Sequence, residues 1–211
     1  MATEPCCLRE HIAFNLYSRL KEPKLFRLAS GLEWSRIEAR AKSHPKEAVF
    51  RHKYPPYDTS LHRLLRPTHP FVTNDGVDDE GEDNESRLKA TQAVILANRQ
   101  ACILQDAFGR TPLHLASMNL HKFGPIVALL LDSSPHAASV LDVERRTPLH
   151  FCLSRHREGQ LDVSVLRLLL KHYPRALDEK DATGDTPVDI FRRHKSSFEN
   201  ADEVSAILSN K

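Results

Sequence analysis

Apolar residues along this chain gather in paired clusters whose spacing predicts helices. A short cluster at 113–116 (Leu-His-Leu-Ala) is followed by a longer one at 126–131 (Ile-Val-Ala-Leu-Leu-Leu), and the same pair returns at 149–152 and 165–170. Pro135 ends the second helix of the first pair, because proline lacks an N–H and forces its predecessor out of helical geometry. The pattern therefore predicts short and longer helices in alternation.

A tetrapeptide of one kind opens each short helix. Its copies are Thr59-Ser-Leu-His62, Thr111-Pro-Leu-His114, Thr147-Pro-Leu-His150 and Thr186-Pro-Val-Asp189. Threonine is a good N-cap, and proline suits the first helical position, where its missing N–H breaks no hydrogen bond. One helix pair cannot bury its own apolar face, so repeated pairs must stack on one another. The sequence thus predicts an all-α solenoid with a continuous core.

The order of turn, Thr-Pro-Leu-His, short helix and Ile-Val-x-Leu-Leu-Leu helix resembles the ankyrin repeat, most fully at 106–131 and 142–170. The resemblance implies an ankyrin-type helix-turn-helix solenoid of about five repeats. It also implies that the Thr and His side chains of the signature form hydrogen bonds within and between repeats. The signature residues are Thr59, His62, Thr111, Pro112, His114, Thr147, Pro148, His150, Thr186 and Pro187. Asp189 stands where histidine is expected, which leaves its part in this network open.

The repeats divide the chain unevenly. We expect residues 1–21 to form an N-terminal segment, either disordered or a short helix, and residues 22–211 to form one repeat domain. The expected units are an N-terminal cap at 22–50 and repeats at about 51–103, 104–139, 140–178 and 179–211, with an acidic insertion at 67–86 in the first. The final helix is polar on one side, as a C-terminal cap must be.

The turn before the tetrapeptide carries glycine in two copies, Gly109 and Gly184, but Arg145 takes this place in the third. Glycine adopts positive φ without strain, whereas a residue with a side chain loses roughly 1 kcal/mol there. The sequence therefore predicts that Arg145→Gly is neutral or stabilising.

The net charge of +2 conceals an uneven distribution of charge. Residues 75–85 hold seven acids and no base, which leaves about +9 on the rest of the chain. This acidic loop is either a disordered segment that aids solubility or a flap that covers a basic surface until a partner displaces it. The basic remainder also makes nucleic-acid binding the alternative function, but the chain lacks a basic groove-binding helix and stacking aromatic residues.

Ankyrin arrays bind through a concave surface of turn tips and exposed inner-helix positions, and the resemblance implies the same use here. Aligning the repeats on Thr111 gives the turn tips, Val143 among them, and the exposed helix ends. The candidate partner-binding residues are Arg66, Phe108, Arg110, Met118, Asn119, Glu144, Arg146, Ser154, Arg155, Asp185, Arg193 and His194. Because the helix-end row is basic, we expect a protein partner with an acidic surface, anchored on Phe108 and Met118. A solvated face without a ligand is the alternative.

Catalytic and metal chemistry find no support in the sequence. There is no phosphate-binding glycine loop, Gly-x-Ser-x-Gly elbow or Cys-x-x-Cys, and three of the twelve histidines are signature residues. Cys152 takes a small buried position of the repeat, while Cys102 follows an outer helix and is expected to be exposed. We therefore expect no enzyme activity, cofactor, metal ion or small-molecule substrate.

Cysteine content and hydropathy indicate the compartment. No apolar run approaches the roughly 18 residues of a membrane span. Four cysteines, two of them the neighbours Cys6 and Cys7, do not form the framework of a secreted disulfide protein. We therefore expect an intracellular monomer, cytoplasmic or nuclear, without membrane association; lipidation of Cys6 or Cys7 stays open.

Overall fold

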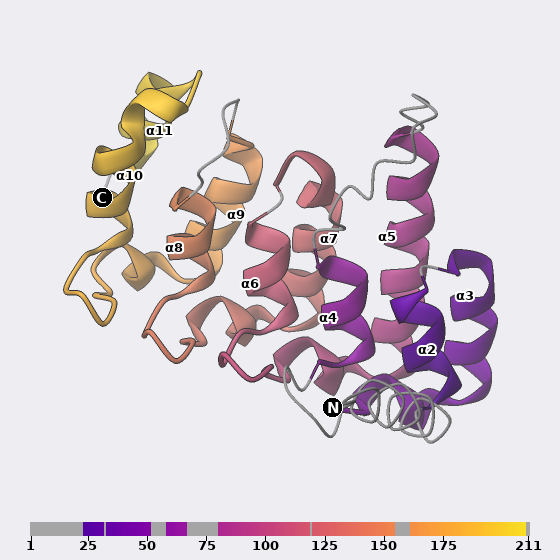
Figure 1. Cartoon of the computed structure of the whole chain (residues 1–211). Helices are drawn as coiled ribbons and strands as arrows, with labels where there is room; N and C mark the ends of the chain where they lie inside the picture. Colours follow the sequence, from indigo (N-terminus) through magenta and orange to yellow (C-terminus); the bar gives the residue numbers. More distant parts are fainter. Residues whose placement is uncertain are drawn as a thin grey trace, which may run out of the picture.

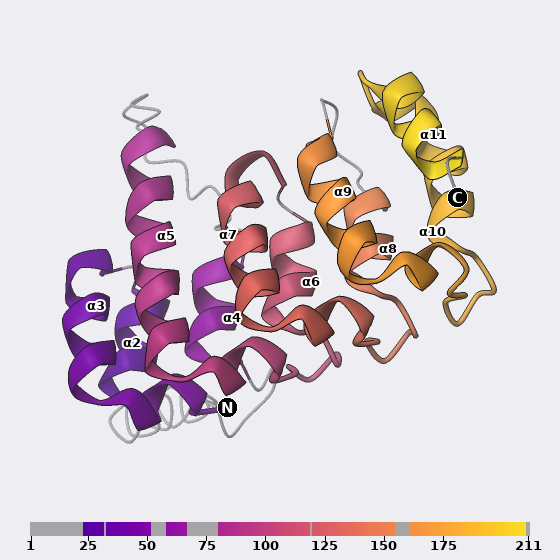
Figure 2. The ribbon, with the colours of Figure 1, turned by 180° about the vertical axis from the view of Figure 1, so that it is seen from behind.

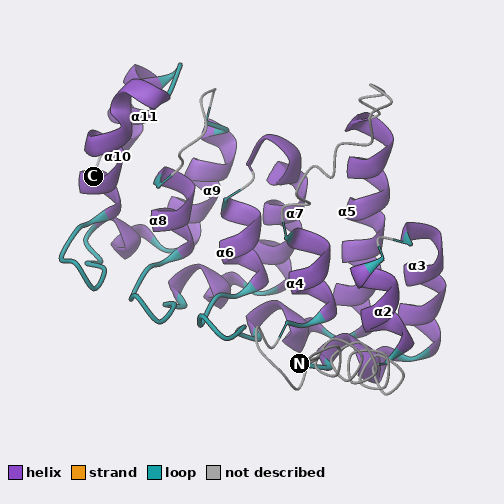
Figure 3. Cartoon of the chain, viewed as in Figure 1, coloured by secondary structure: helices purple, strands orange, loops and turns teal. Residues whose placement is uncertain are grey.

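Two layers of helices build this protein (Figure 1). The computed structural model describes residues 23–31, 33–51, 58–66, 80–118, 120–154 and 161–209. Inner and outer helices alternate along the chain, and successive pairs stand side by side in one elongated array. The described residues contain no β-strand (Figure 3). The prediction of an all-α helical solenoid is confirmed.

Each layer holds five of the described α-helices. The inner layer, nearer the viewer in Figure 1, contains α2 (Lys24–Ser30), α4 (Ser60–Leu65), α6 (Pro112–Ser117), α8 (Pro148–Leu153) and α10 (Pro187–His194). The outer layer, nearer the viewer in Figure 2, contains α3 (Trp34–Ser43), α5 (Glu80–Ala97), α7 (Leu120–Ser133), α9 (Val163–His172) and α11 (Ala201–Ser209).

A short 3-10 helix follows each of the first four described outer helices. These turns are η1 (Pro45–Val49), η2 (Arg99–Ile103), η3 (Pro135–Ser139) and η4 (Pro174–Leu177). Proline opens three of them, because its fixed φ suits the first position of a helical turn. Each turn also buries an alanine, respectively Ala48, Ala101, Ala137 and Ala176. The small side chain lets the backbone of the turn pack closely on the core.

The apolar core runs between the two layers as one continuous cluster. Leu64 and Leu113 of the inner helices contribute to it together with Leu130 and Leu166 of the outer helices, and all four are fully buried. Each helix pair is covered by its neighbours, so the stability of the array is shared between adjacent repeats.

Helix α5 begins earlier than the sequence pattern predicts. Residues 80–86 of the expected acidic insertion are not a loop but form the first two turns of this helix. Acidic residues near a helix N-terminus are stabilised by the positive end of the helix dipole, and Glu85 pairs with Lys89 at 2.6 Å. The rest of the insertion, 67–79, and the predicted N-terminal segment 1–21 lie outside the described residues.

Side chains that bond to the backbone hold the two ends of the described array. At the N-terminal end, the Glu47 carboxylate accepts from the N–H of Leu25 at 2.9 Å and binds the guanidinium of Arg40. At the C-terminal end, the Asn200 amide donates to the carbonyl of Leu161 and accepts from its N–H, each at 2.9 Å. Asn200 thus ties the start of α11 to the segment before α9.

Candidate functional site

A buried aspartate shapes the turn tip of the second repeat. The Asp106 carboxylate accepts hydrogen bonds from the N–H groups of Phe108 and Arg110, each at 2.9 Å. Its second oxygen accepts two bonds from the Arg110 guanidinium, at 2.9 and 2.7 Å. Burial opposes ionisation of Asp106, but the bonds from Arg110 and the backbone outweigh it and lower the pKa of the carboxyl. The charged carboxylate therefore fixes the shape of the turn.

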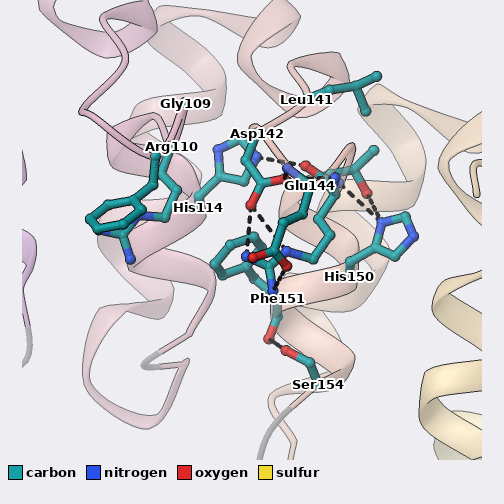
Figure 4. A network of polar contacts seen from close by, with 12 residues as sticks. Gly109, Arg110, His114, Leu141, Asp142, Glu144, His150, Phe151 and Ser154 are labelled. Atoms are coloured by element: carbon teal, nitrogen blue, oxygen red, sulfur yellow. Dashed lines mark hydrogen bonds and ion pairs between the residues drawn. The ribbon is translucent and has the colours of Figure 1, made fainter. Parts of the chain in front are cut away.

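The next two turns are built on the same plan. Asp142 accepts from the N–H groups of Glu144 and Arg146 at 2.9 and 2.8 Å, and its other oxygen binds the Arg146 guanidinium (Figure 4). Asp181 accepts from the N–H of Thr183 at 2.8 Å and from its hydroxyl at 2.7 Å. The three turn tips are thus fixed by local bonds.

The signature histidines link each repeat to the next. The N–H of Thr111 donates to Nδ1 of His114 at 3.0 Å, so the proton of the neutral ring resides on Nε2. That Nε2 donates to the carbonyl of Arg146, in the following turn, at 3.1 Å (Figure 4). His62 makes the equivalent bond to Arg110 at 2.8 Å. Burial lowers the pKa of His114 to about 4, which keeps the ring neutral at pH 7.

The third and fourth signature copies depart from this arrangement. His150 accepts from the N–H of Thr147 at 3.0 Å, but its Nε2 faces the carbonyl of Asp185 without reaching full hydrogen-bond geometry. In the fourth copy, Asp189 accepts from the N–H of Thr186 at 3.1 Å and from its hydroxyl at 2.6 Å. An ionised carboxylate has no proton to donate to a following turn. Asp189 therefore makes the hydrogen bonds with Thr186 within its own repeat, but it cannot donate the bond that histidine makes to a following turn.

Much of the predicted basic row is paired within the protein. Arg66 binds Asp58 at 2.8 Å, and Arg193 binds Asp185 at 2.5 Å. Arg110, at a turn tip, is likewise held by its own aspartate. Each of these cations has a carboxylate beside it, so the described part of the concave surface attracts an acidic partner less than the sequence suggests.

Exposed apolar side chains stand at two neighbouring turn tips. Phe108 is 51% exposed and Val143 is 65% exposed. The N–H of Val143 donates to the carbonyl of Phe108 at 3.0 Å, so the two residues lie side by side. The guanidinium of Arg110 stacks on the Phe108 ring, 4.5 Å from its centroid. The alignment of the repeats placed Val143 at a turn tip, but only the bond between turns pairs it with Phe108.

The inner helices add to the surface only near their ends. All six residues of α6 and all six of α8 are buried, so their C-terminal caps, Met118 and Ser154, supply the accessible positions. Met118 is 39% exposed and Ser154 is half-buried. His194, at the end of α10, is half-buried as well. The candidates Asn119 and Arg155 lie outside the described residues.

Reactive groups in the described part of the chain do not assemble into a chemical site. No three His, Cys, Asp or Glu side chains there are placed to hold a metal ion. Cys152 is buried, and so is Cys102, whose predicted exposure is wrong because η2 turns the thiol toward the core. Burial raises the pKa of Cys102 to about 11, so its thiol stays protonated at pH 7. Of the described helices, none is long and apolar enough to cross a bilayer.

Comparison with known families gives this architecture a name. A family model described as ankyrin repeats (3 copies) matches residues 84–178, which run from within α5 to just past η4. Residues 84–178 are ankyrin repeats. The matched ankyrin repeats contain the Asp106 and Asp142 turns and the His114 link, and the helix pairing continues on both sides of them.

Sequence comparison adds no individual relative to the ankyrin match. No curated protein sequence resembles the chain closely enough to count as one. Ankyrin repeats are generally protein–protein interaction modules, and they are typically non-enzymatic. The ankyrin match thus gives the broad class of activity and leaves the partner to be found from the surface.

Proposed function

We propose that this ankyrin array is a non-enzymatic interaction module, or adaptor, that binds another protein through its turn tips and the C-terminal ends of its inner helices. The observation that carries the proposal is the adjacent, exposed pair Phe108 and Val143. Aspartates hold the backbone of both turns in place, so the turns lose little backbone freedom on binding and burial of the two side chains contributes to affinity. Met118 adds a further apolar contact at the end of α6.

The charged candidate residues orient the partner more than they attract it. Arg110 and Arg146 are bound to carboxylates in their own turns, and Glu144 lies 2.9 Å from the Arg146 guanidinium. Arg145 is exposed and forms no ion pair with a described residue. The partner surface that fits best is therefore apolar, with an acidic group beside the apolar contact to meet Arg145.

The test is a cross-linked pull-down from native lysate with wild type and with Phe108→Ser/Val143→Ser. We expect the wild type to recover a protein that the variant loses. The matched control is Leu96→Ser/Ile103→Ser, which removes two exposed apolar side chains outside the turn tips and should retain the partner. Equal recovery by wild type and the turn-tip variant would rule out the turn tips as the binding surface.

Nucleic-acid binding is the second candidate function, favoured by the charge of about +9 outside residues 75–85. Salt separates the two candidates. Binding that neutralises phosphates weakens steeply as salt rises, whereas binding through apolar anchors persists. Nucleic acid that is recovered at low salt and lost at high salt would favour the alternative. The intracellular location and the monomeric state stay predictions from the sequence.

A further inference from the structure

The outer layer opens into a groove between α9 and α11, where α11 stands apart at the end of the array (Figure 2). Its volume of about 520 Å³ lies in the range common for binding sites. The lining residues are Arg167, Leu170 and Lys171 of α9, and Glu203, Ala206 and Ile207 of α11. On both helices these residues are spaced i, i+3 and i+4, so each wall of the groove is one helical face.

The groove is a fixed feature of the fold, because α11 is anchored at its start and along its buried face. Asn200 bonds the start of α11 to Leu161, and Val204 and Leu208 are buried in the core. Leu170 and Ile207 are half-buried and pack against that same core. The floor of the groove is therefore apolar and continuous with the interior of the protein.

Unpaired charge borders this apolar floor. Arg167 and Lys171 are exposed and one helical turn apart, and neither side chain forms an ion pair or hydrogen bond with a described residue. The arginines at the turn tips and inner-helix ends differ, because they bind carboxylates; Arg66, for example, binds Asp58. Glu203, on the opposite wall, is the other charged lining residue. The groove thus has a positive rim along α9 and a negative one along α11.

We propose that this groove binds an amphipathic helix of a partner protein. Two walls with i, i+3, i+4 spacing accept a third helix, because its side chains enter the spaces between theirs. Leu170 and Ile207 receive apolar side chains spaced three or four residues apart. Since α9 has ten residues, or about 15 Å of helix, the bound segment spans about two to three turns.

The charges on the two rims set the sequence of the bound helix. Arg167 and Lys171 select two carboxylates spaced one turn apart along one edge, and Glu203 selects a basic residue on the other edge. The site lies in the outer layer, on different helices from the turn-tip surface, and does not depend on the proposed function above.

The test is peptide selection on the full chain. The probe is a display library of peptides of about 14 residues, with apolar residues fixed at i, i+3, i+4 and i+7 and the other positions random. We expect enriched peptides to carry Asp or Glu pairs four residues apart beside the apolar stripe. Fluorescence anisotropy then measures how tightly one enriched peptide binds to each variant.

Three variants probe the groove. Arg167→Glu/Lys171→Glu should weaken binding about tenfold or more, and Ala206→Trp should block it by filling the groove. The matched control, Arg175→Glu/Lys180→Glu, reverses the same charge on exposed residues outside the groove and should change binding by less than about twofold. Circular dichroism melts establish that each variant is folded.

Reversing the charges on both the peptide and the groove tests most specifically whether the two pair with each other. Lysines in place of the acidic pair of the peptide should restore binding to Arg167→Glu/Lys171→Glu. A selection that enriches nothing, or peptides whose binding neither groove variant alters, would overturn the proposal. If those peptides instead lose binding to Phe108→Ser/Val143→Ser, the groove proposal fails while the turn-tip proposal stands.

Discussion

The Nε2 atom of His114 lies 3.1 Å from the carbonyl oxygen of Arg146, so a buried imidazole bridges two ankyrin repeats. The bond requires a neutral ring with its proton on Nε2, because Nδ1 accepts from the backbone of Thr111. His62 bridges to Arg110 in the same way. The stacking of the repeats is therefore coupled to the protonation of these side chains.

Mild acid should destabilise the array. Burial lowers the pKa of His62, His114 and His150 below the usual 6.5. Below pH 6.5 the unfolded state binds more protons than the folded state, so stability present above that pH is lost as pH falls toward the folded pKa, about 4 for His114. From pH 7 to pH 5, His114 alone should lower the free energy of unfolding by about 2 kcal/mol in urea denaturation.

Two glutamine variants identify the source of this pH dependence. His114→Gln keeps an N–H donor but does not titrate, so the fall in stability between pH 7 and pH 5 should become smaller. His136→Gln replaces an exposed histidine and should leave the fall unchanged. An unaltered pH dependence in His114→Gln would contradict the role assigned to the buried ring.

Arg145→Gly should leave the melting temperature unchanged or raise it. Arg145 has a φ of 60°, where a side chain costs roughly 1 kcal/mol relative to glycine. Part of the gain is cancelled, because glycine also gives the unfolded chain more freedom. Thermal melting followed by circular dichroism measures the net effect. A clear fall in melting temperature would refute the prediction.

Gly109 and Gly184 occupy the same turn position, with φ of 72° and 90°, in different surroundings. A Cβ at Gly109 would lie 2.9 Å from the backbone nitrogen of Val143, whereas one at Gly184 meets no atom within 4 Å. Gly184→Ala should lower the free energy of unfolding by about 1 kcal/mol through φ alone. Gly109→Ala should lower it by about 2 kcal/mol or more, because the next turn must move. Equal losses in urea would disprove the close contact between turns.

Arg87 is buried between the rings of Trp34 and Phe123, with 5.0 Å from its guanidinium carbon to each centroid. It also donates to the carbonyl of Leu64 at 2.8 Å, so one planar cation joins α3, α4, α5 and α7. Arg87→Lys keeps the charge but loses the planar guanidinium that stacks on the two rings. It should lower the free energy of unfolding by about 1–3 kcal/mol. Lys89→Ala, an exposed change on the same helix, should hardly alter the melting temperature. A larger loss in Lys89→Ala would contradict this role of Arg87.

Local chemistry of the repeat can be predicted from the sequence, whereas contacts between distant residues cannot. Thr111 and His114 lie within one helical turn, so their spacing alone predicts the cap and the buried ring. Burial of Cys102 depends on how η2 packs against other helices. The charge of Arg66 is offset by Asp58, which lies at the opposite end of α4. Periodicity also shows which face of a helix is buried, but not where two helices diverge. The groove between α9 and α11 therefore has no signal in the sequence.

The incomplete bond from His150 to Asp185 leaves the α8–α10 interface without the full link that His62 and His114 make between their repeats. When the two ends of a linear array are pulled, every interface between repeats carries the same force, and the least bonded interface gives way first. The α8–α10 interface keeps the bond from the N–H of Ala182 to the carbonyl of Glu144 but lacks the full histidine link. Among the interfaces that carry a signature histidine, we therefore expect the α8–α10 interface to open first under tension, so that α10 and α11 detach together once the bonds between Asn200 and Leu161 break.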